Sequence, residues 1–346
     1  MNKLLVLHNP LITEDDTMDA SQKVIWDCVW FGNYPQTEIK QTDVEYLLLQ
    51  NVEGWDNNGD IVINNNVINN NVINGTKYHR MLKGDATYSK SGSSMYYSWE
   101  DDTTYHYFRY EPVKWRVLKT DGNVAMLLSD IALDDRKYNA KRESTTWETS
   151  TIRSWLNGYN ADMNQEGISY SITNFINSAF TYEEQSAIAD TNIVNNDNLY
   201  CSIEGGNNTN GGNNTNGGNN TMDKLFLLSE SEVYTNNAVT YGFVSDNRVD
   251  DEAKRCKSSD YAKAMGLCSI TSAGCKGNCW WWLRSPGDSS NSAVCVNYYG
   301  NVCNYGDYNN YHGYGVRVAL NLKLSFSNFY TYAGTVCSDR TVDILE

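Results

Sequence analysis

Cys295 and Cys303 are the two residues whose type and spacing come closest to a reactive pair. Seven residues separate them, and Tyr299-Gly300 lies in the middle of that interval. A hairpin that turns at Tyr299-Gly300 would place the two thiols near one another across two strands, close enough for a disulfide or a soft metal ion. The pair is therefore the place where this chain could carry out redox chemistry.

Other catalytic constellations are absent from the sequence. None of the four histidines, His8, His79, His106 and His312, lies at the spacing of a metal site or a catalytic triad. Neighbouring carboxylates, in Asp134-Asp135 and in residues 250–252, are interpreted as solvated faces. The sequence thus predicts a protein that is not an enzyme and that needs no cofactor and no metal.

A second group of cysteines does not follow a metal-binding pattern. Its spacing is C-x11-C-x6-C-x3-C, without a paired zinc signature or a nearby histidine. Buried free thiols, or disulfides if the protein is exported, are favoured over a metal site for Cys256, Cys268, Cys275 and Cys279.

The segment 295–315 has the composition of a contact surface. Apart from Val296 and Val302, it contains only Asn, Tyr, Gly, Asp, Cys and His. Tyrosine offers large and rather rigid amphipathic area, and Asn and Gly offer adaptable hydrogen bonds, as in antibody binding loops. Alternatively, the tyrosines are only cross-strand pairs and Asn and Gly only build turns. The candidate ligand-binding residues are Asn297, Tyr299, Asn301, Asn304, Asp307, Tyr308, Asn309, Asn310, Tyr311 and His312.

Charge and hydropathy narrow the range of partners. The formal net charge of −15 repels nucleic acid and anionic lipid. No run approaches the ~20 apolar residues that span a bilayer. The apolar run at the N-terminus, Leu4–Leu7, is too short for a secretory signal, so the chain as written is expected to be cytoplasmic. A protein or glycan ligand is the expected partner.

The elements that must position these residues are short helices between groups of strands. Asp-Gly between residues 113–118 and 124–129 indicates a hairpin. Ser150 can cap a helix, and Thr181 with Glu184 and Ser229 with Glu232 have the spacing of capping boxes. A further helix is predicted over 258–265, closed by Gly266, and strands are predicted over 280–284, 293–298 and 316–322. This order favours an α+β fold with a twisted antiparallel sheet, short helices and long irregular loops.

One domain is expected over residues 24–323, preceded by a leader over 1–23 and followed by a tail over 324–346. Two low-complexity inserts interrupt it, at 57–76 and 204–222. Their Asn-rich repeats cannot bury a core, so both are predicted to be loops.

Six motifs together resemble a widespread, uncharacterised bacterial domain family. Its members show FGxYPQ, W-x-x-S-x-x-R-x-W-L-N, WWLRSPG and GVRPAL in this order. The stretches of this chain that carry the resemblance lie at 26–38, 112–118, 145–157, 223–229, 281–287 and 315–322, and four of them contain these motifs, with Val318 in place of the proline of GVRPAL. The resemblance covers residues 24–323.

This resemblance implies a C-type-lectin-like fold of the formylglycine-generating-enzyme type. Some relatives are the variable proteins of diversity-generating retroelements, in which adenines are miscopied and Asn codons become codons for Tyr, Asp, Gly, Cys or His. The variable segment then ends just before a closing strand, as 295–315 does. The enzymes of this fold bind copper through a cysteine pair, a pair that Cys295 and Cys303 do not reproduce in spacing or flanking residues.

Three hypotheses follow from the sequence. The leading one is a non-enzymatic protein that binds a protein or glycan through 295–315. The others are an oxidoreductase that uses Cys295 and Cys303, and a purely structural domain. Within the motifs, Trp281, Arg284 and Arg317 are expected to be structural, the arginines anchoring loops through carbonyl oxygens or a carboxylate.

Overall fold

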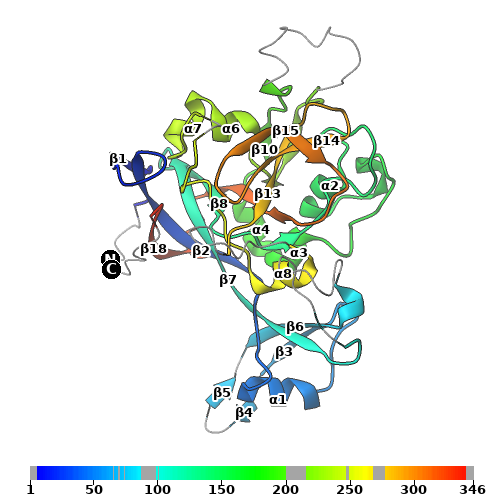
Figure 1. Cartoon of the computed structure of the whole chain (residues 1–346). Helices are drawn as coiled ribbons and strands as arrows, with labels where there is room; N and C mark the ends of the chain where they lie inside the picture. Colours follow the sequence, from blue (N-terminus) through cyan, green and yellow to red (C-terminus); the bar gives the residue numbers. More distant parts are fainter. Residues whose placement is uncertain are drawn as a thin grey trace.

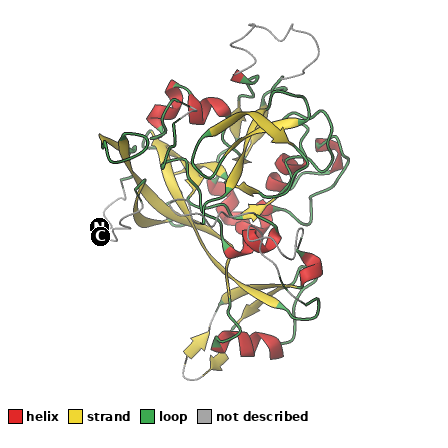
Figure 2. Ribbon diagram, viewed as in Figure 1, coloured by secondary structure: helices red, strands yellow, loops and turns green. Residues whose placement is uncertain are grey.

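The protein has a mixed α+β fold of mostly antiparallel sheets and short helices, in agreement with the predicted class (Figures 1 and 2). A main body occupies the upper part of Figure 1, and a smaller lobe projects below it. The computed structural model describes residues 6–64, 66–68, 71–73, 75–86, 99, 101–199, 216–246, 249–267 and 277–339.

A nine-stranded antiparallel sheet connects the body with the lobe. Its order is β1-β2-β7-β8-β17-β12, while β18 also pairs with β2, β6 with β7, and β3 with β6. The long strands β2 and β7 extend from the body into the lobe (Figure 1). The strands are β1 (Leu11–Glu14), β2 (Gln22–Glu38), β3 (Asp60–Ile63), β6 (Thr76–Met81), β7 (His106–Thr120), β8 (Val124–Ser129), β12 (Leu225–Phe226), β17 (Ala319–Lys323) and β18 (Thr331–Cys337).

A five-stranded sheet carries the candidate binding segment. Its order is β15-β14-β13-β16-β9, so β15 is an edge strand. All pairs are antiparallel except β13 with β16. The strands are β9 (Asp134–Asp135), β13 (Trp280–Pro286), β14 (Ser292–Val296), β15 (Val302–Tyr308) and β16 (Tyr314–Val316). Two separate two-stranded antiparallel sheets pair β4 (Asn66–Ile68) with β5 (Asn71–Ile73) and β10 (Thr191–Ile193) with β11 (Thr221–Asp223).

The helices are short, and five of them, α2, α3, α4, α6 and α8, begin at side-chain caps. Ser150 accepts a hydrogen bond from the N–H of Arg153, and both predicted capping boxes are confirmed. The helix predicted over 258–265 begins instead at Asp260, because Ser259 is its cap. The helices are α1 (Val44–Asn51), α2 (Thr151–Asn157), α3 (Phe175–Ala179), α4 (Tyr182–Ala187), α6 (Glu230–Tyr234), α7 (Asn236–Thr240) and α8 (Asp260–Met265), with 3-10 turns at Lys83–Asp85 and Ala161–Met163.

Large aromatic side chains fill the main core. Five tryptophans are fully buried, and each indole N–H donates a hydrogen bond to a carbonyl oxygen or, in one case, to a carboxylate. Tryptophan therefore provides apolar area without an orphaned polar group. These residues are Trp26, Trp115, Trp147, Trp281 and Trp282.

The glycine of FGNYPQ occupies a position that excludes a side chain. Gly32 has a φ of +68°, and a Cβ there would lie 2.5 Å from the ring of Phe180 and 2.7 Å from the carbonyl oxygen of Ala179. Only glycine combines this left-handed backbone with such close packing. The motif thus lets β2 pass directly against the end of α3.

The small lobe has a core of its own, and part of the first insert belongs to it. Ile63 of β3 packs with Tyr46, Tyr78 and Tyr107 in a cluster separate from the main core. The prediction that residues 57–76 are a loop is therefore wrong for β3, β4 and β5, because Val and Ile between the asparagines permit strand pairing. Most of the second insert lies outside the described residues.

Both predicted terminal segments contribute strands. β1 pairs with the start of β2, and β18 pairs with the next part of the same strand. Leu11–Glu14 of the predicted leader and Thr331–Cys337 of the predicted tail thus belong to the nine-stranded sheet, because β2 is long enough to accept both neighbours.

The strand predicted over 316–322 is divided between the two sheets. β16 ends at Val316, and β17 begins at Ala319. Between them, Arg317 Nε donates to the carbonyl oxygen of Ser129, and the N–H of Val318 donates to Ser129 Oγ at 3.1 Å. The closing motif is therefore a crossover from one sheet to the other, and Val318 uses the N–H that a proline would lack.

Candidate functional site

The segment 295–315 forms the hairpin of β14 and β15 and the loop that leads into β16 (Figure 1). Its turn is closed by a hydrogen bond from Gly300 N to the Asn297 carbonyl oxygen at 3.0 Å. Asn297 Oδ1 accepts two further backbone N–H groups of the turn. Gly300 has a φ of +90°, and a Cβ there would lie 2.0 Å from the Asp251 carbonyl oxygen. The predicted turn at Tyr299-Gly300 is confirmed, and its backbone is tightly held.

Three tyrosines of the segment present large exposed area. Tyr299 is 38% exposed at the turn, Tyr305 is 53% exposed on β15, and Tyr311 is 44% exposed beyond the other end of β15. The exposed tyrosines therefore follow the edge strand from one end to the other.

Three polar candidates of the segment hold the local structure. Asn301 Nδ2 donates to Asp250 at 2.9 Å, and Asp307 accepts a hydrogen bond from the hydroxyl of Tyr314. His312 Nδ1 lies 2.9 Å from a carboxylate oxygen of Asp135. Their side chains are engaged within the protein, so they stabilise the loop that carries the exposed rings.

Two of the ten candidates are buried. Asn304 and Asn309 are 7% and 1% exposed. Asn309 Nδ2 donates to the carbonyl oxygen of Glu143 at 2.7 Å, and Asn198 donates to the carbonyl oxygen of Asn304 at the same distance. Asn304 and Asn309 are therefore corrected to packing residues, whereas Asn310 is half-buried. Asn304 lies on β15, where alternation turns every second side chain inward, whereas Asn309 lies just beyond the end of β15; composition reveals neither position.

A basic residue outside the segment joins the surface. The Arg142 guanidinium lies over the ring of Tyr308 at 3.2 Å from its centre, and Tyr311 meets Tyr308 edge-on at 5.2 Å. Arg142 is exposed. Sequence reasoning missed this residue, because no local pattern around Arg142 connects it with a strand about 160 residues later.

The hairpin places the two candidate redox cysteines opposite one another. Cys295 and Cys303 are direct partners in the register of β14 and β15. Burial raises the pKa of Cys295, whereas a hydrogen bond from Cys295 lowers the pKa of Cys303. Cys295 is fully buried and Cys303 half-buried, so Cys303 is the thiol with more thiolate character and more access to solvent.

The three residues expected to be structural lie in the core. Arg284 donates to the Leu227 carbonyl oxygen at 2.8 Å and forms an ion pair with Glu232. Arg317 donates to the carbonyl oxygens of Ser129 and Lys254 and lies over the ring of Trp281. Through these contacts, Arg284 and Arg317 hold separate elements of the fold together.

Several carboxylates predicted to be solvated are buried. Asp134 and Asp135 have no exposed area, and Asp134 accepts a hydrogen bond from the hydroxyl of Tyr34 at 2.6 Å. Asp251 is also fully buried and lies 3.3 Å from Lys254 Nζ. The prediction of solvated faces was wrong for these three residues. Asp134 and Asp135 have partners from distant parts of the chain, Tyr34 and His312, and Asp251 has the buried Lys254 three residues later.

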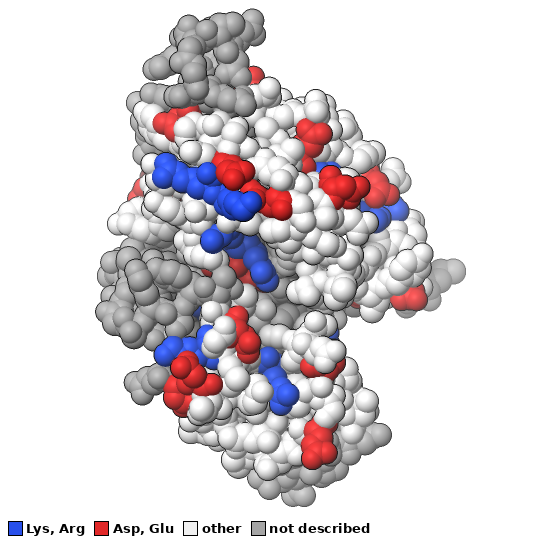
Figure 3. Space-filling view, turned by 90° about the vertical axis from the view of Figure 1, so that its right-hand side faces the viewer, with Lys and Arg blue, Asp and Glu red and all other residues white. Residues whose placement is uncertain are grey.

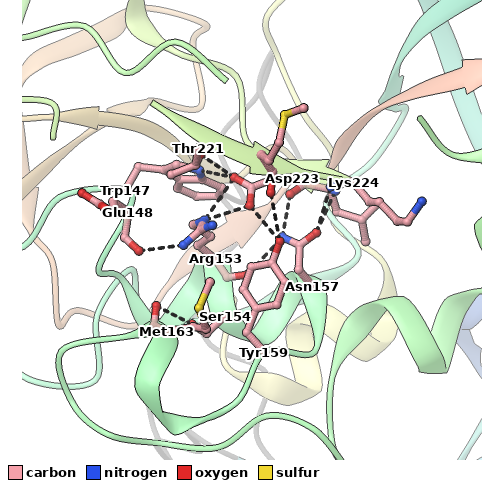
Figure 4. Close-up of polar contacts among 12 residues, drawn as sticks. Trp147, Glu148, Arg153, Ser154, Asn157, Tyr159, Met163, Thr221, Asp223 and Lys224 are labelled. Carbon is pink, nitrogen blue, oxygen red and sulfur yellow. Dashed lines mark hydrogen bonds and ion pairs between the residues drawn. The ribbon is translucent and has the colours of Figure 1, made fainter. Parts of the chain in front are cut away.

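The W-x-x-S-x-x-R-x-W-L-N motif forms a buried polar network with β11. Figure 4 shows Asp223 between Trp147, Arg153 and Tyr159, all directed toward its carboxylate. Arg153 Nε lies 2.8 Å from Asp223 Oδ1, and both side chains are buried. A cavity of about 500 Å³ adjoins this network, lined partly by Arg153. The network joins α2 to the strand that precedes β12.

The family described as a domain of unknown function (DUF6273) matches residues 122–324, more than half of the chain. The chain belongs to this family. The DUF6273 match begins in the turn between β7 and β8 and ends just after β17, so it includes α2, the buried network and the tyrosine hairpin. FGNYPQ lies before the matched range. No curated protein and no solved structure matches this DUF6273 chain.

No three His, Cys, Asp or Glu side chains in the described ranges are grouped as metal ligands. Among the described helices, none is long and apolar enough to cross a membrane.

Glu230 of the DUF6273 domain gives a testable pH dependence. Burial raises its pKa from 4.5 to about 7. Between these values only the unfolded state ionises, so we expect Glu230 to lower the free energy of unfolding by about 3 kcal/mol as pH rises from about 4.5 to above 7. Urea unfolding of wild type and Glu230→Gln across this range measures the difference.

Compared with the wild type, Glu230→Gln should become more stable as pH rises, since glutamine cannot ionise. Glu183→Gln, at an exposed residue of α4, is the matched control and should leave the pH profile unchanged. Parallel profiles for wild type and Glu230→Gln would contradict the assignment.

Proposed function

We propose that this chain is a non-enzymatic binding protein with a C-type-lectin-like fold, whose 295–315 surface contacts a protein or glycan. One observation carries the proposal: Tyr299, Tyr305 and Tyr311 are exposed on a segment in which the side chains of Asn297, Asn301 and His312 hold the local structure. Rigid presentation of tyrosine reduces the entropy lost on binding.

The spread of the tyrosines favours a macromolecular ligand. Tyr299 and Tyr311 flank the seven-residue strand β15. A strand of this length spans about 20 Å. This exceeds a single sugar ring and suits a protein surface or an extended glycan, with Arg142 and Tyr308 adding a cation–π pair at one end.

Replacing Tyr299, Tyr305 and Tyr311 together by Ala is expected to weaken ligand binding at least 100-fold, because tyrosines that become buried against a partner commonly act as interface hot spots of about 1–2 kcal/mol or more each. A protein and glycan array, followed by titration of the strongest ligand, measures the effect.

The matched control replaces two exposed tyrosines elsewhere, Tyr182→Ala on α4 and Tyr332→Ala on β18. It should bind like the wild type. Equal binding by the triple variant would contradict the surface assignment and favour a purely structural domain.

The segment's composition also supports, as a further part of the proposal, diversification by a retroelement. Nearly all of its residue types can be reached by miscopying the adenines of Asn codons. The coding DNA tests this: AAY-type codons here and a near-identical template repeat beside a reverse-transcriptase gene are expected. Without such a repeat the surface would be a fixed one.

The cross-strand register of Cys295 and Cys303 favours a second candidate, an oxidoreductase. Two facing thiols suit a soft ion such as Cu(I). If this function holds, the wild type binds one equivalent of Cu(I) and Cys295→Ser does not, as measured by competition with a chromogenic chelator. Cys28→Ser, at another buried cysteine, is the control. Unchanged copper binding in Cys295→Ser would eliminate the candidate.

A further inference from the structure

Cys295 and Cys303 face one another on two paired strands. They are direct partners in the antiparallel register of β14 and β15, and Val296 and Val302 form the next pair. Direct partners on antiparallel strands have Cα atoms about 4.5–5.5 Å apart, within the range of about 4.4–6.8 Å that disulfide bonds require. Their side chains also leave the sheet on the same face. The backbone therefore already holds the two residues in a position that a disulfide bond can join.

The two thiols differ in their access to solvent. Cys295 is fully buried. In the register of the sheet it lies between Cys303 and Trp282, and the ring of Tyr314 stacks on Trp282 with the ring centres 4.0 Å apart. Cys303 lies on the edge strand β15 and is half-buried. A small oxidant dissolved in water thus reaches Cys303 before Cys295.

Cys303 is also the thiol that is prepared to react first. The hydrogen bond from Cys295 lowers the pKa of Cys303, whereas burial raises the pKa of Cys295. The thiolate is the form that attacks an oxidant, and a second thiol beside it can then attack the oxidised sulfur. The pair therefore provides one residue for each of two steps.

The charge of the chain favours a neutral oxidant. A formal net charge of −15 repels anions such as glutathione disulfide. Figure 3 shows one face of the molecule, on which Lys and Arg side chains lie among Asp and Glu side chains. A small neutral hydroperoxide meets no such repulsion, so it is the class of oxidant that suits the half-buried thiol.

We propose that a hydroperoxide converts Cys295 and Cys303 reversibly into a disulfide bond that fastens the edge strand β15 to β14. With hydrogen peroxide, the Cys303 sulfur attacks one peroxide oxygen, an S–O bond forms, the O–O bond breaks, and the other oxygen leaves as water with the thiol proton. The Cys295 sulfur then attacks the sulfenic acid, an S–S bond forms, the S–O bond breaks, and a second water leaves with the proton of Cys295. The two thiols lose two electrons together, and the peroxide takes them up.

The bond acts on the strand that carries Tyr305. An edge strand is hydrogen-bonded to a neighbouring strand on one side, so it opens more easily than a central strand. Tyr299 lies inside the loop that the bond closes, and Tyr305 lies two residues beyond it. The proposal concerns the hairpin itself, so it depends neither on the proposed ligand binding nor on copper.

Peptide mapping of the full chain tests the proposal. The protein is treated with hydrogen peroxide in the presence of a metal chelator, alkylated and digested with trypsin, which cuts after Arg284 and Arg317 and not between the two cysteines. The bond should lower the mass of peptide 285–317 by two hydrogen atoms and block alkylation of both thiols, and dithiothreitol should restore both. Two unmodified thiols after peroxide treatment, or a sulfinic acid at Cys303, overturn the proposal.

A second oxidant tests the choice of a neutral hydroperoxide. Glutathione disulfide at the same concentration should react at least about tenfold more slowly than hydrogen peroxide, because the negative charge of the chain repels it. A comparable or higher rate with glutathione disulfide overturns this choice.

Single variants test the order of the two steps. In Cys295→Ser, peroxide should leave Cys303 as a sulfenic acid that dimedone labels, because the second thiol is missing. In Cys303→Ser, the buried Cys295 should stay a thiol, and dimedone labelling of Cys295 there overturns the order. Cys28→Ser, at a buried cysteine of β2, is the control and should form the bond like the wild type. If a variant does not fold, the peptide map of the wild type still decides.

Amide hydrogen exchange measures the effect on the edge strand. Oxidation should slow exchange over residues 302–308 at least about tenfold, because a disulfide limits the opening of the segment that it closes. Dithiothreitol should reverse the change, and the central strand β8 should exchange equally in both forms. Unchanged exchange over β15 in the fully oxidised protein overturns the claim that the bond fastens this strand.

Discussion

Replacing Arg317 by Ala is expected to lower the free energy of unfolding by about 3–5 kcal/mol. The side chain is fully buried at the crossover between the two sheets. Its removal would leave a large void beside Trp281 and would take hydrogen bonds from the carbonyl oxygens of Ser129 and Lys254. Urea unfolding monitored by tryptophan fluorescence and by far-ultraviolet circular dichroism measures the loss.

Two further variants separate this role from a general effect of charge. Arg317→Lys should lose a smaller but substantial part of the stability, because an ammonium cannot donate in the same planar geometry. Arg142→Ala, at an exposed arginine, should change stability by no more than about 0.5 kcal/mol. A loss below about 1 kcal/mol for Arg317→Ala would show that it does not join the sheets.

Local signals explain which elements could be predicted from the sequence. The Asp-Gly turn before β8 and the caps Ser150, Thr181 and Ser229 operate within a few residues, and each is present in the structure. The division of the strand predicted over 316–322 into β16 and β17 does not follow from a local signal. It depends on Ser129, which is 188 residues from Arg317 and receives its hydrogen bond. No periodicity within the strand contains that information.

The same distinction applies to the candidate site. The turn at Gly300 and the facing cysteines follow from strand alternation and could be predicted, whereas the burial of Asn304 depends on Asn198, 106 residues away. Asp134 was expected in solvent because adjacent carboxylates usually are. Its partner, the hydroxyl of Tyr34, lies 100 residues earlier in the chain. Buried polar networks formed between distant segments were thus the main feature that sequence reasoning could not provide.

Asp223→Ala is expected to lower the free energy of unfolding by about 3–5 kcal/mol, because it leaves the buried guanidinium of Arg153 without its counter-ion. It also removes the acceptor for Trp147 Nε1 and for the Thr221 and Tyr159 hydroxyls (Figure 4). Urea unfolding measures the loss, and Asp190→Ala, at a largely exposed carboxylate beside Lys224, is the control with little expected change.

A double-mutant cycle identifies the cause of that loss. If the unpaired guanidinium causes most of the loss in stability, replacing Arg153 by Met as well should restore part of it. The double variant should then lose less free energy of unfolding than the two single variants together. Additive losses would instead mean that Asp223 acts mainly through Trp147, Thr221 and Tyr159. The motif arginine would then contribute to packing on Tyr159, over whose ring its guanidinium lies at 4.9 Å, rather than to an ion pair between α2 and β11.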